Sequence, residues 1–422
     1  MRVLALGGAG AMGAAAVRAA ATLLTVTEIV VADQDLAAAR ALAVELAGRG
    51  VVVRALRVDI TDPDALNGAM HTADVVLNTV GPYHRFGPTV LQAAILTRTH
   101  YLDICDDGEP TTRMLDLHDA AKATGVCAIV GIGASPGVSN LLALTATRGL
   151  QRVDNLYTAW PVDVPESAGT VGPPGPDGIA EAAAVHWMQQ ISGTITVVRN
   201  GELAEEPPLR AVTLDLPGGR GGDAYTVGHP EPITMHRTLF PHGEAANLMV
   251  VTPGTAAFLK VLRTDIDSGR LTNESAAHEV TKPSLSRILR SLTRISSRTS
   301  HGTLPPFFAA ATGHTGTHDR TTIAYLADTG ETARLLADRA RATGISLALG
   351  LSQLIDGTAR KPGVYPPEAI IDADRFFGDL ATRLGMSPAV SLFGVEHTPD
   401  QAAATPRDRI GRMGRASSSP IR

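Results

Sequence analysis

The first 33 residues carry the pattern that most restricts how this chain folds. Residues 3–6 are apolar, and the stretch that follows contains Gly-x-Gly-x-x-Gly, with its glycines at Gly8, Gly10 and Gly13. A second apolar run, 29–32, ends at Asp33, twenty residues after Gly13. A strand, a glycine turn, a helix and a second strand that ends in a carboxylate are typical of dinucleotide-binding βαβ units. We therefore expect the chain to begin with such a unit.

The spacing predicts a different role for each glycine and for Asp33. Gly8 permits a tight turn, Gly10 lets the backbone approach a pyrophosphate, and Gly13 lets the helix pack against the strand. The N–H groups at the start of that helix face the phosphates. Asp33 would accept hydrogen bonds from ribose hydroxyls and repel a 2′-phosphate, and Gln34, not an arginine, follows it. The sequence therefore predicts NAD(P) as cofactor and favours NAD.

Strands and helices alternate through the first 140 residues, which predicts parallel strands joined by right-handed crossovers. Ligands of such sheets bind beyond the carboxyl ends of the strands. The predicted coenzyme-binding residues are Gly8, Gly10, Ala11, Met12, Gly13, Asp33, Asp59, Asn78, Gly81, Pro82 and Ser135.

The pattern changes after about residue 150 to mixed strands and helices. Strands at 194–199 and 209–216 are predicted around a turn at 200–201, and a hairpin at 307–311 and 321–326. The fold class is α/β: a Rossmann-type doubly wound parallel sheet plus an inserted α+β substrate and dimerisation domain with an open mixed sheet. The predicted domains are 1–140, 141–360, a segment 361–397 that returns to the first domain, and a disordered tail 398–422.

Composition excludes several classes of protein. The net charge of −5 argues against a nucleic-acid-binding protein. Two cysteines without a Cys-x-x-Cys pair suggest neither a disulfide framework nor a zinc site. No apolar stretch is long enough to span a membrane, and the N-terminus does not read as a signal peptide, so we expect a cytoplasmic protein.

Four segments together resemble the saccharopine dehydrogenase family, and the likeness covers most of residues 1–397. They are 7–13; 74–83, which ends Val-Gly-Pro-Tyr and leads to 101–103; 131–140, which reads Gly-Ile-Gly-Ala-Ser-Pro-Gly-Val-Ser-Asn; and 361–368, Lys-Pro-Gly-Val-Tyr-Pro-Pro-Glu. The resemblance implies a Rossmann domain, an inserted α/β domain that closes over a small-molecule substrate, and a homodimer. It also implies hydride transfer, in most members at a carbon–nitrogen bond.

Such chemistry needs an acid/base group with a tuned pKa and negative charge for an ammonium or iminium. His84 is the best-placed acid/base residue in the sequence, although an ordinary loop histidine fits equally well. Asp103 and Asp106 are predicted to be catalytic. Asp107, beside them, and Tyr83 are predicted to bind substrate. The alternative for the aspartates is a solvated turn that caps the next helix.

Other polar residues point less directly to a site. Arg237 is a candidate for binding a substrate carboxylate, with a surface arginine as the alternative. The pair His314 and His318 lies beside glycines that argue against a helix, so no metal site is predicted. Arginines at 287, 290, 294 and 298 form a basic stripe on a predicted amphipathic helix. Such a stripe is most often a solvated face, and otherwise meets an acidic partner, an anionic substrate or another subunit.

The sequence thus predicts an NAD(P)-dependent dehydrogenase or reductase that acts on CH–NH or CH–NH2 groups of an amino-acid-like substrate. The acidic residues at 103–107 favour this interpretation. The first alternative is an enoyl reductase that reduces a carbon–carbon double bond in a lipid or polyketide, favoured by residues 81–83 and the basic stripe. The second is a dinucleotide-binding protein without catalytic activity.

Overall fold

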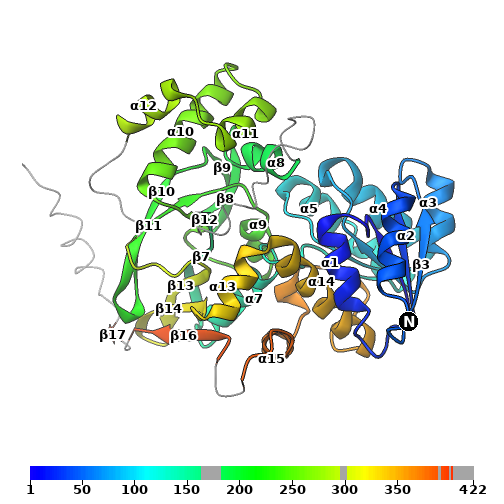
Figure 1. The fold of residues 1–422 in the computed structure, drawn as a ribbon. Coiled ribbons are helices and arrows are strands. Elements are labelled where there is room, and N and C mark those ends of the chain that lie inside the picture. The colour runs from blue at the N-terminus through cyan, green and yellow to red at the C-terminus, as the bar shows by residue number, and fades with distance from the viewer. Residues whose placement is uncertain (163–181, 295–301, 388–390, 399–400, 403–422) are drawn as a thin grey trace, which may run out of the picture.

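Two β-sheets form separate halves of the molecule, and helices cover both (Figure 1). The computed structural model describes residues 1–162, 182–294, 302–387, 391–398 and 401–402. This arrangement confirms the predicted fold class, a parallel Rossmann-type sheet with a second, mixed sheet.

The first sheet is parallel throughout and has seven strands. Its strands, in order across the sheet, are β15 (Gly363–Tyr365), β6 (Cys127–Ile129), β5 (His100–Asp103), β4 (Val75–Asn78), β1 (Arg2–Leu6), β2 (Glu28–Asp33) and β3 (Val52–Arg57). The order reverses between β1 and β4, so the crevice for a ligand opens where the glycine turn after β1 meets the end of β4.

Helices of this half begin where the sequence supplies capping groups. The side chain of Asp35 accepts hydrogen bonds from two N–H groups of α2, and Asp62 does the same for α3. The helices of this half are α1 (Ala11–Ala20), α2 (Leu36–Glu45), α3 (Pro63–Met70), α4 (Tyr83–Thr97), α5 (Gly108–Leu115), α6 (His118–Thr124), α14 (Arg339–Asp356) and α15 (Ala373–Arg383).

The second sheet is mixed: β12 and β7 are parallel, and the other neighbours along its main path are antiparallel. Its main path is β10 (Ala211–Leu216), β11 (Arg220–Thr226), β12 (Ala245–Val250), β7 (Arg152–Pro161), β13 (Phe308–Thr315), β14 (His318–Leu326) and β16 (Phe393–His397). Beside this path lie β8 (Ile195–Arg199), β9 (Glu202–Glu206) and β17 (Gln401–Ala402).

Residues of this sheet alternate between two cores, as strand geometry requires. Ala309 and Ala311 belong to the large core shared with the first half, whereas Phe308 and Ala310 belong to a second core. The helices of this half are α7 (Val138–Thr147), α8 (Ala182–Gln190), α9 (Glu231–Thr238), α10 (Pro253–Asp267), α11 (Asn273–Thr281), α12 (Leu285–Leu292) and α13 (Gly330–Ala337). Short 3-10 helices occur at Pro217–Gly219 and Pro367–Ala369. None of the helices in the described ranges has the length and apolar character needed to cross a bilayer.

Strand pairing after residue 190 differs in part from the prediction. The turn at 200–201 joins β8 to β9, with Arg199 opposite Glu202, whereas the predicted partner, 211–216, pairs with β11. The prediction passed over β9 because Glu-Leu-Ala-Glu-Glu has little β-propensity; it is an edge strand, where charged residues are tolerated. The hairpin of β13 and β14 forms as a long antiparallel pair from 308 to 326.

The chain returns to the first half in a different way from the one expected. Helix α14 already packs on α1: a Cβ atom at Gly344 would lie 2.5 Å from the backbone N of Ala16. Strand β15 then extends the first sheet, but β16, within the predicted returning segment, pairs with β14 of the second sheet. Of the predicted tail, 399–400 and 403–422 lie outside the described residues.

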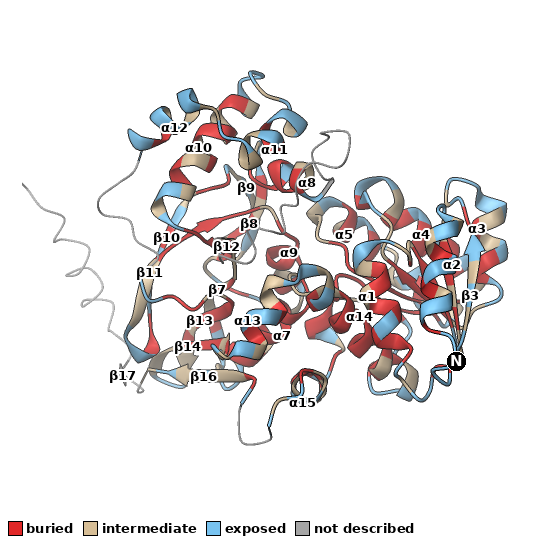
Figure 2. Ribbon diagram, in the orientation of Figure 1, coloured by how far each residue is buried: buried red, intermediate tan, exposed pale blue. Residues whose placement is uncertain are grey.

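The basic stripe faces inward, which overturns its interpretation as a solvated face. Arg287 and Arg290 of α12 both bind the carboxylate of Asp265, whose side chain is fully buried on α10. The apolar side chains of α12 lie outward instead, and Leu285 is 79% exposed. Most of α12 has the colour of exposed residues in Figure 2. Three arginines, Arg270 included, surround Asp265 and hold its pKa well below its usual range. Residue 298 lies outside the described residues.

Candidate active site between the two sheets

The glycine turn has the close approach that its spacing predicts. A Cβ atom at Gly13 would lie 2.2 Å from the carbonyl oxygen of Gly7, and one at Gly8 would lie 2.7 Å from that of Ala5. Gly7 adopts a φ of +68°, which favours glycine. The first residues of α1, Ala11 and Met12, follow directly, so their N–H groups start a helix at the crevice.

Asp33 lies beside this turn and is bonded to it. One carboxylate oxygen accepts a hydrogen bond from the N–H of Ala9 at 3.1 Å, and the other accepts one from Asp35 at 3.1 Å. Arg57, at the end of β3, is the register partner of Asp33 and is exposed. Asp59 follows β3, and its carboxylate accepts hydrogen bonds from Thr61 that lower its pKa. At the end of the crevice beside β2 and β3, the carboxylate of Asp33 therefore supports the glycine turn, and the Arg57 cation lies next to it.

Three predicted site residues lie beneath the crevice as a buried network. The amide of Asn78 donates to the hydroxyl of Tyr101 at 2.9 Å, which donates to Asp103 at 2.8 Å. The hydroxyl of Tyr83 donates to the carbonyl of Asn78 at 2.9 Å. Asp103 also accepts a hydrogen bond from the N–H of Gly131 at 2.7 Å.

Burial raises the pKa of Asp103 to about 6, although these hydrogen bonds oppose the rise. Asn78 and Asp103 have no exposed surface, and Tyr83 is buried. These side chains lie buried beneath the ends of β4 and β5, where we expect them to position those strand ends, and the roles predicted for them from sequence stay predictions.

Asp106 and Asp107 project from the loop after β5 toward the second half of the molecule. His186 of α8 places its Nε2 atom 3.3 Å from a carboxylate oxygen of each. Asp107 occupies the N-cap position of α5, but its side chain makes no cap hydrogen bond. The alternative of a plain helix-capping turn therefore does not describe these side chains, which form a cluster that links the two halves.

Asp106, Asp107 and His186 shift one another's pKa values. Burial lowers the pKa of His186, but the two carboxylates outweigh it and raise this pKa to about 9. Burial raises the pKa of Asp106, yet the His186 cation brings it below its usual value, whereas burial keeps the pKa of Asp107 raised. Their three ligand atoms lie within 4.8 Å of one another, close enough to share a metal ion. With its pKa raised to about 9, His186 is protonated at neutral pH and pairs with both carboxylates.

A buried Glu–His pair adjoins this cluster. Nδ1 of His229 lies 3.3 Å from Oε2 of Glu231, and neither atom has a hydrogen-bond partner among the described residues. The other oxygen of Glu231 accepts hydrogen bonds from Ser135 at 2.5 Å, Ser139 at 2.9 Å and Asn247 at 2.9 Å. Because three donors hold its other oxygen, Glu231 stays in place and orients His229.

Further contacts fix the imidazole ring of His229. The ring lies against the indole of Trp160 with 5.5 Å between centroids, and the Trp160 N–H donates to Asn247 at 2.8 Å. The charge of His229 also acts on Asp106 and Asp107, so the pair belongs to the same site. Burial raises the pKa of Glu231, but the imidazole and the hydrogen bond from Ser135 bring it below its usual value.

The remaining predicted residues occupy the borders of the site. His84 is exposed in the first turn of α4, and its charge lowers the pKa of Asp107, which places it near the cluster. Gly81 and Pro82 lie exposed just before α4. Ser135 holds Glu231, as described above. Arg237 donates to Asp116 at 3.1 Å, so it connects α9 of the second half to the end of α5 in the first half.

Sequence reasoning missed His186, His229 and Glu231. They come from α8, the turn before α9 and the first residue of α9, in a region of mixed pattern where no motif marks them. The one available signal was a histidine followed two residues later by a carboxylate beside prolines, at 229–232. Such a pattern is common at turns, so only the tertiary structure shows that His186 meets Asp106 and that Glu231 faces His229.

The His186 cluster predicts a loss of stability at alkaline pH. The pKa of His186 is raised from its ordinary 6.5 to about 9 in the folded protein. Its ion pairs therefore contribute their full stabilisation below pH 6.5, and this stabilisation is lost as the pH rises through 9. The whole effect is at most about 3 kcal/mol. Urea unfolding between pH 6.5 and 10 should show this decline in the free energy of unfolding. It should be much smaller in His186→Gln; parallel declines in the two proteins would refute the assignment.

Comparisons with known proteins agree with a dinucleotide-binding first half. Residues 3–129 match the model of the saccharopine dehydrogenase NADP-binding domain. The chain is 37% identical over 76 residues to the trans-acting enoyl reductase of Mycobacterium leprae, and 34% identical over 82 residues to a probable mitochondrial saccharopine dehydrogenase-like oxidoreductase of Arabidopsis thaliana. These matches span 18% of the length of each relative. The NAD preference expected from Asp33 gains no support, because the matching domain is described as NADP-binding.

The fold has a solved counterpart over nearly the whole chain. Apo saccharopine dehydrogenase (L-Glu forming) of Saccharomyces cerevisiae superposes with a TM-score of 0.61 and 17% sequence identity. The match covers 94% of this chain and 100% of the yeast chain. The resemblance inferred from sequence is therefore confirmed: residues 3–129 match the NADP-binding domain of the saccharopine dehydrogenase family, and the chain shares the fold of the yeast saccharopine dehydrogenase.

Proposed function

We propose that this protein is an NADP(H)-dependent oxidoreductase that transfers hydride at a carbon–nitrogen bond of a cationic, amino-acid-like substrate. The observation that carries this proposal is the charge of the site between the sheets. Three carboxylates (Asp106, Asp107 and Glu231) meet two imidazoles there, and no lysine or arginine of the described residues pairs with those carboxylates. This excess of negative charge suits an ammonium or iminium group and gives a neutral lipid nothing to bind.

The glycine turn and the start of α1 would hold the pyrophosphate of the coenzyme, and the ends of β4 and β5 would face its nicotinamide. When bound, NADPH supplies the hydride, and NADP⁺ accepts it in the opposite direction. The residues of the chain orient the substrate and move the proton. Asp106 and Asp107 would hold the substrate cation, with His186 keeping both carboxylates in position.

His229 is the proton carrier that the geometry supports best. Glu231 faces its Nδ1, which leaves Nε2 available to a substrate nitrogen, in the arrangement by which an acid orients a catalytic histidine. In reduction, hydride adds to the iminium carbon, the π electrons move to nitrogen, and the neutral amine takes a proton from His229. In oxidation the same imidazole removes that proton before hydride leaves. His84, at the border, is the second candidate for this role.

The choice between NADP and NAD should depend on Arg57. Both oxygens of Asp33 are bonded to backbone N–H groups, while Arg57, its neighbour on β3, is exposed and has no ion pair within the described ranges. A guanidinium there would bind a 2′-phosphate. Arg57→Gln should raise the Kd for NADPH at least about 10-fold and leave the Kd for NADH unchanged, as followed by coenzyme fluorescence.

Arg54→Gln is the matched control, because Arg54 lies on the same strand but pairs with Glu28 at 3.1 Å. It should change neither Kd. If the native protein binds NADH more tightly than NADPH, the NAD preference that Asp33 suggests is correct and our choice is wrong.

A second candidate function is the reduction of a carbon–carbon double bond, favoured by the 37% identity to an enoyl reductase. NADPH oxidation should be measured with a cyclic imine carboxylate and, separately, with a crotonyl thioester. Turnover of the imine alone supports our proposal, and turnover of the thioester alone supports the alternative. If NADPH binds and neither substrate reacts, a coenzyme-binding protein without catalysis becomes the better description. The homodimer and the cytoplasmic location expected from the sequence remain proposals.

A further inference from the structure

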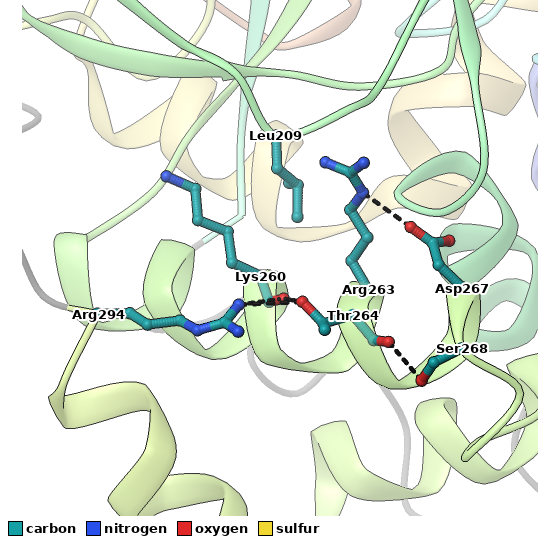
Figure 3. Close-up of a pocket in the computed structure, with 7 residues that line it drawn as sticks. All are labelled: Leu209, Lys260, Arg263, Thr264, Asp267, Ser268 and Arg294. Atoms are coloured by element: carbon teal, nitrogen blue, oxygen red, sulfur yellow. Dashed lines mark hydrogen bonds and ion pairs between the residues drawn. The ribbon is translucent and has the colours of Figure 1, made fainter.

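A polar pocket lies in the second half of the chain and shares no residue with the site between the sheets. It has a volume of about 520 Å3 and is formed by α10, the residues just after α12 and the segment before β10 (Figure 3). The residues that line it are Leu209, Lys260, Arg263, Thr264, Asp267, Ser268 and Arg294. Volumes of this size are typical of small-molecule pockets.

Cations outnumber carboxylates in this cavity by three to one. Arg263 pairs with Asp267 at 3.2 Å, and Asp267 also accepts a hydrogen bond from Gly193. Among the described residues Arg294 donates only to neutral acceptors, the carbonyl of Lys260 at 2.9 Å and the hydroxyl of Thr264 at 3.0 Å. Lys260 and Arg294 have no carboxylate within ion-pair distance in the part of the chain that the structure describes.

The positive charges of Arg294 and Arg263 lie close enough to Lys260 to repel its ammonium group. Burial lowers the pKa of Lys260, and the charges of Arg294 and Arg263 lower it further. The ammonium of Lys260 lies 4.9 Å from the centre of the Tyr225 ring, which compensates in part. The two hydrogen bonds of Arg294 hold its exposed guanidinium at the carbonyl of Lys260 and the hydroxyl of Thr264. The chain thus holds cations together at a cost in stability that a bound anion would remove.

We propose that this cavity binds a small organic anion that carries a phosphate or pyrophosphate group. Arg263 and Arg294 offer guanidinium N–H groups suited to phosphate oxygens, and Lys260 adds a third positive charge. In Figure 3 the side chain of Leu209 lies between those of Lys260 and Arg263 and adds apolar surface, so the ligand combines a charged group with a less polar body. This proposal is independent of the reaction proposed above.

Pyrophosphate is the probe for the test, added to the full-length protein and followed by calorimetry. The double variant Lys260→Gln/Arg294→Gln should weaken its binding at least about 10-fold, since two charge-assisted contacts are lost. The control Arg148→Gln/Arg334→Gln removes the same charge from exposed surface pairs and should bind as the native protein does. Equal affinity in the two double variants, or no binding to the native protein at about 10 mM, would overturn the proposal.

Thermal unfolding supplies a second readout that does not depend on the probe. Without ligand, Lys260→Gln/Arg294→Gln should have a higher Tm than the native protein, because the repulsion between like charges is gone. Pyrophosphate should raise the Tm of the native protein and leave that of the variant unchanged. A lower Tm for the variant in the absence of ligand would show that these cations serve the fold and would count against an anion site.

Discussion

Replacing Glu231 by Gln is expected to lower kcat at least about 100-fold, while the Kd for NADPH stays within about two-fold of the native value. The substitution keeps the shape of the side chain but removes the charge that faces Nδ1 of His229 at 3.3 Å. The glycine turn that would bind the coenzyme is on another part of the chain. His229→Gln should have a similar effect, because without the imidazole no group at this position carries the proton. Steady-state kinetics with the imine substrate and coenzyme fluorescence provide the two measurements.

The combination of these variants tests whether the two residues act as one unit. Glu231→Gln/His229→Gln should be about as slow as either single variant, because a histidine that is no longer oriented has little left to lose. Ser139→Ala is the matched control: it removes one of three hydrogen bonds to Glu231 but leaves its charge, and kcat should fall less than about five-fold. If His84→Gln abolishes activity and His229→Gln does not, the sequence-based choice of His84 is correct and our proton carrier is wrong.

Gly13→Ala is expected to lower the free energy of unfolding by about 2–3 kcal/mol and to abolish measurable coenzyme binding. The added Cβ atom would lie 2.2 Å from the carbonyl oxygen of Gly7 and 2.8 Å from Cα of Gly8. Both neighbours are backbone atoms of the turn itself, so the turn must move away from the helix. Moving it displaces the N–H groups that would face the pyrophosphate. Urea unfolding and fluorescence titration with NADPH measure the two effects.

Gly68→Ala is a control of the same chemistry in α3. A Cβ atom there meets nothing within 4 Å, and alanine favours a helix more than glycine does. This variant should be more stable than the native protein by about 0.5–1 kcal/mol and bind NADPH normally. Normal coenzyme binding by Gly13→Ala would mean that the turn does not cradle a pyrophosphate, and the proposed function would fail with it.

Local sequence signals located the first half of the fold with few errors. The glycine spacing and the apolar strands act over a few residues, so they can be recognised without knowing what packs against them. The second sheet was harder to predict. The turn at 200–201 was found, but β9 was missed, because an edge strand rich in glutamate carries little apolar pattern.

The basic stripe of α12 shows how a correct local pattern can be misinterpreted. The helical spacing of its arginines was plain, yet solvent was the expected neighbour of that face. The structure places Asp265, a buried carboxylate from α10, against Arg287 and Arg290. The buried carboxylate of Asp265 lies more than twenty positions before these arginines in sequence. Because it binds them, the basic face of α12 lies inward and the apolar face outward.

The sequence by itself determined that this chain opens with a dinucleotide-binding turn, a parallel sheet and an acidic loop after β5, because those features depend on neighbouring residues. Only the tertiary structure decided what the acidic loop meets. His186 lies 79 and 80 positions beyond Asp107 and Asp106, and Glu231 lies more than a hundred beyond them, so no periodic pattern connects them. His186 meets Asp106 and Asp107 because α8 reaches the loop after β5, where Gln190 donates to the carbonyl of Asp106, and α9 packs against α5 with Met235 in the large shared core.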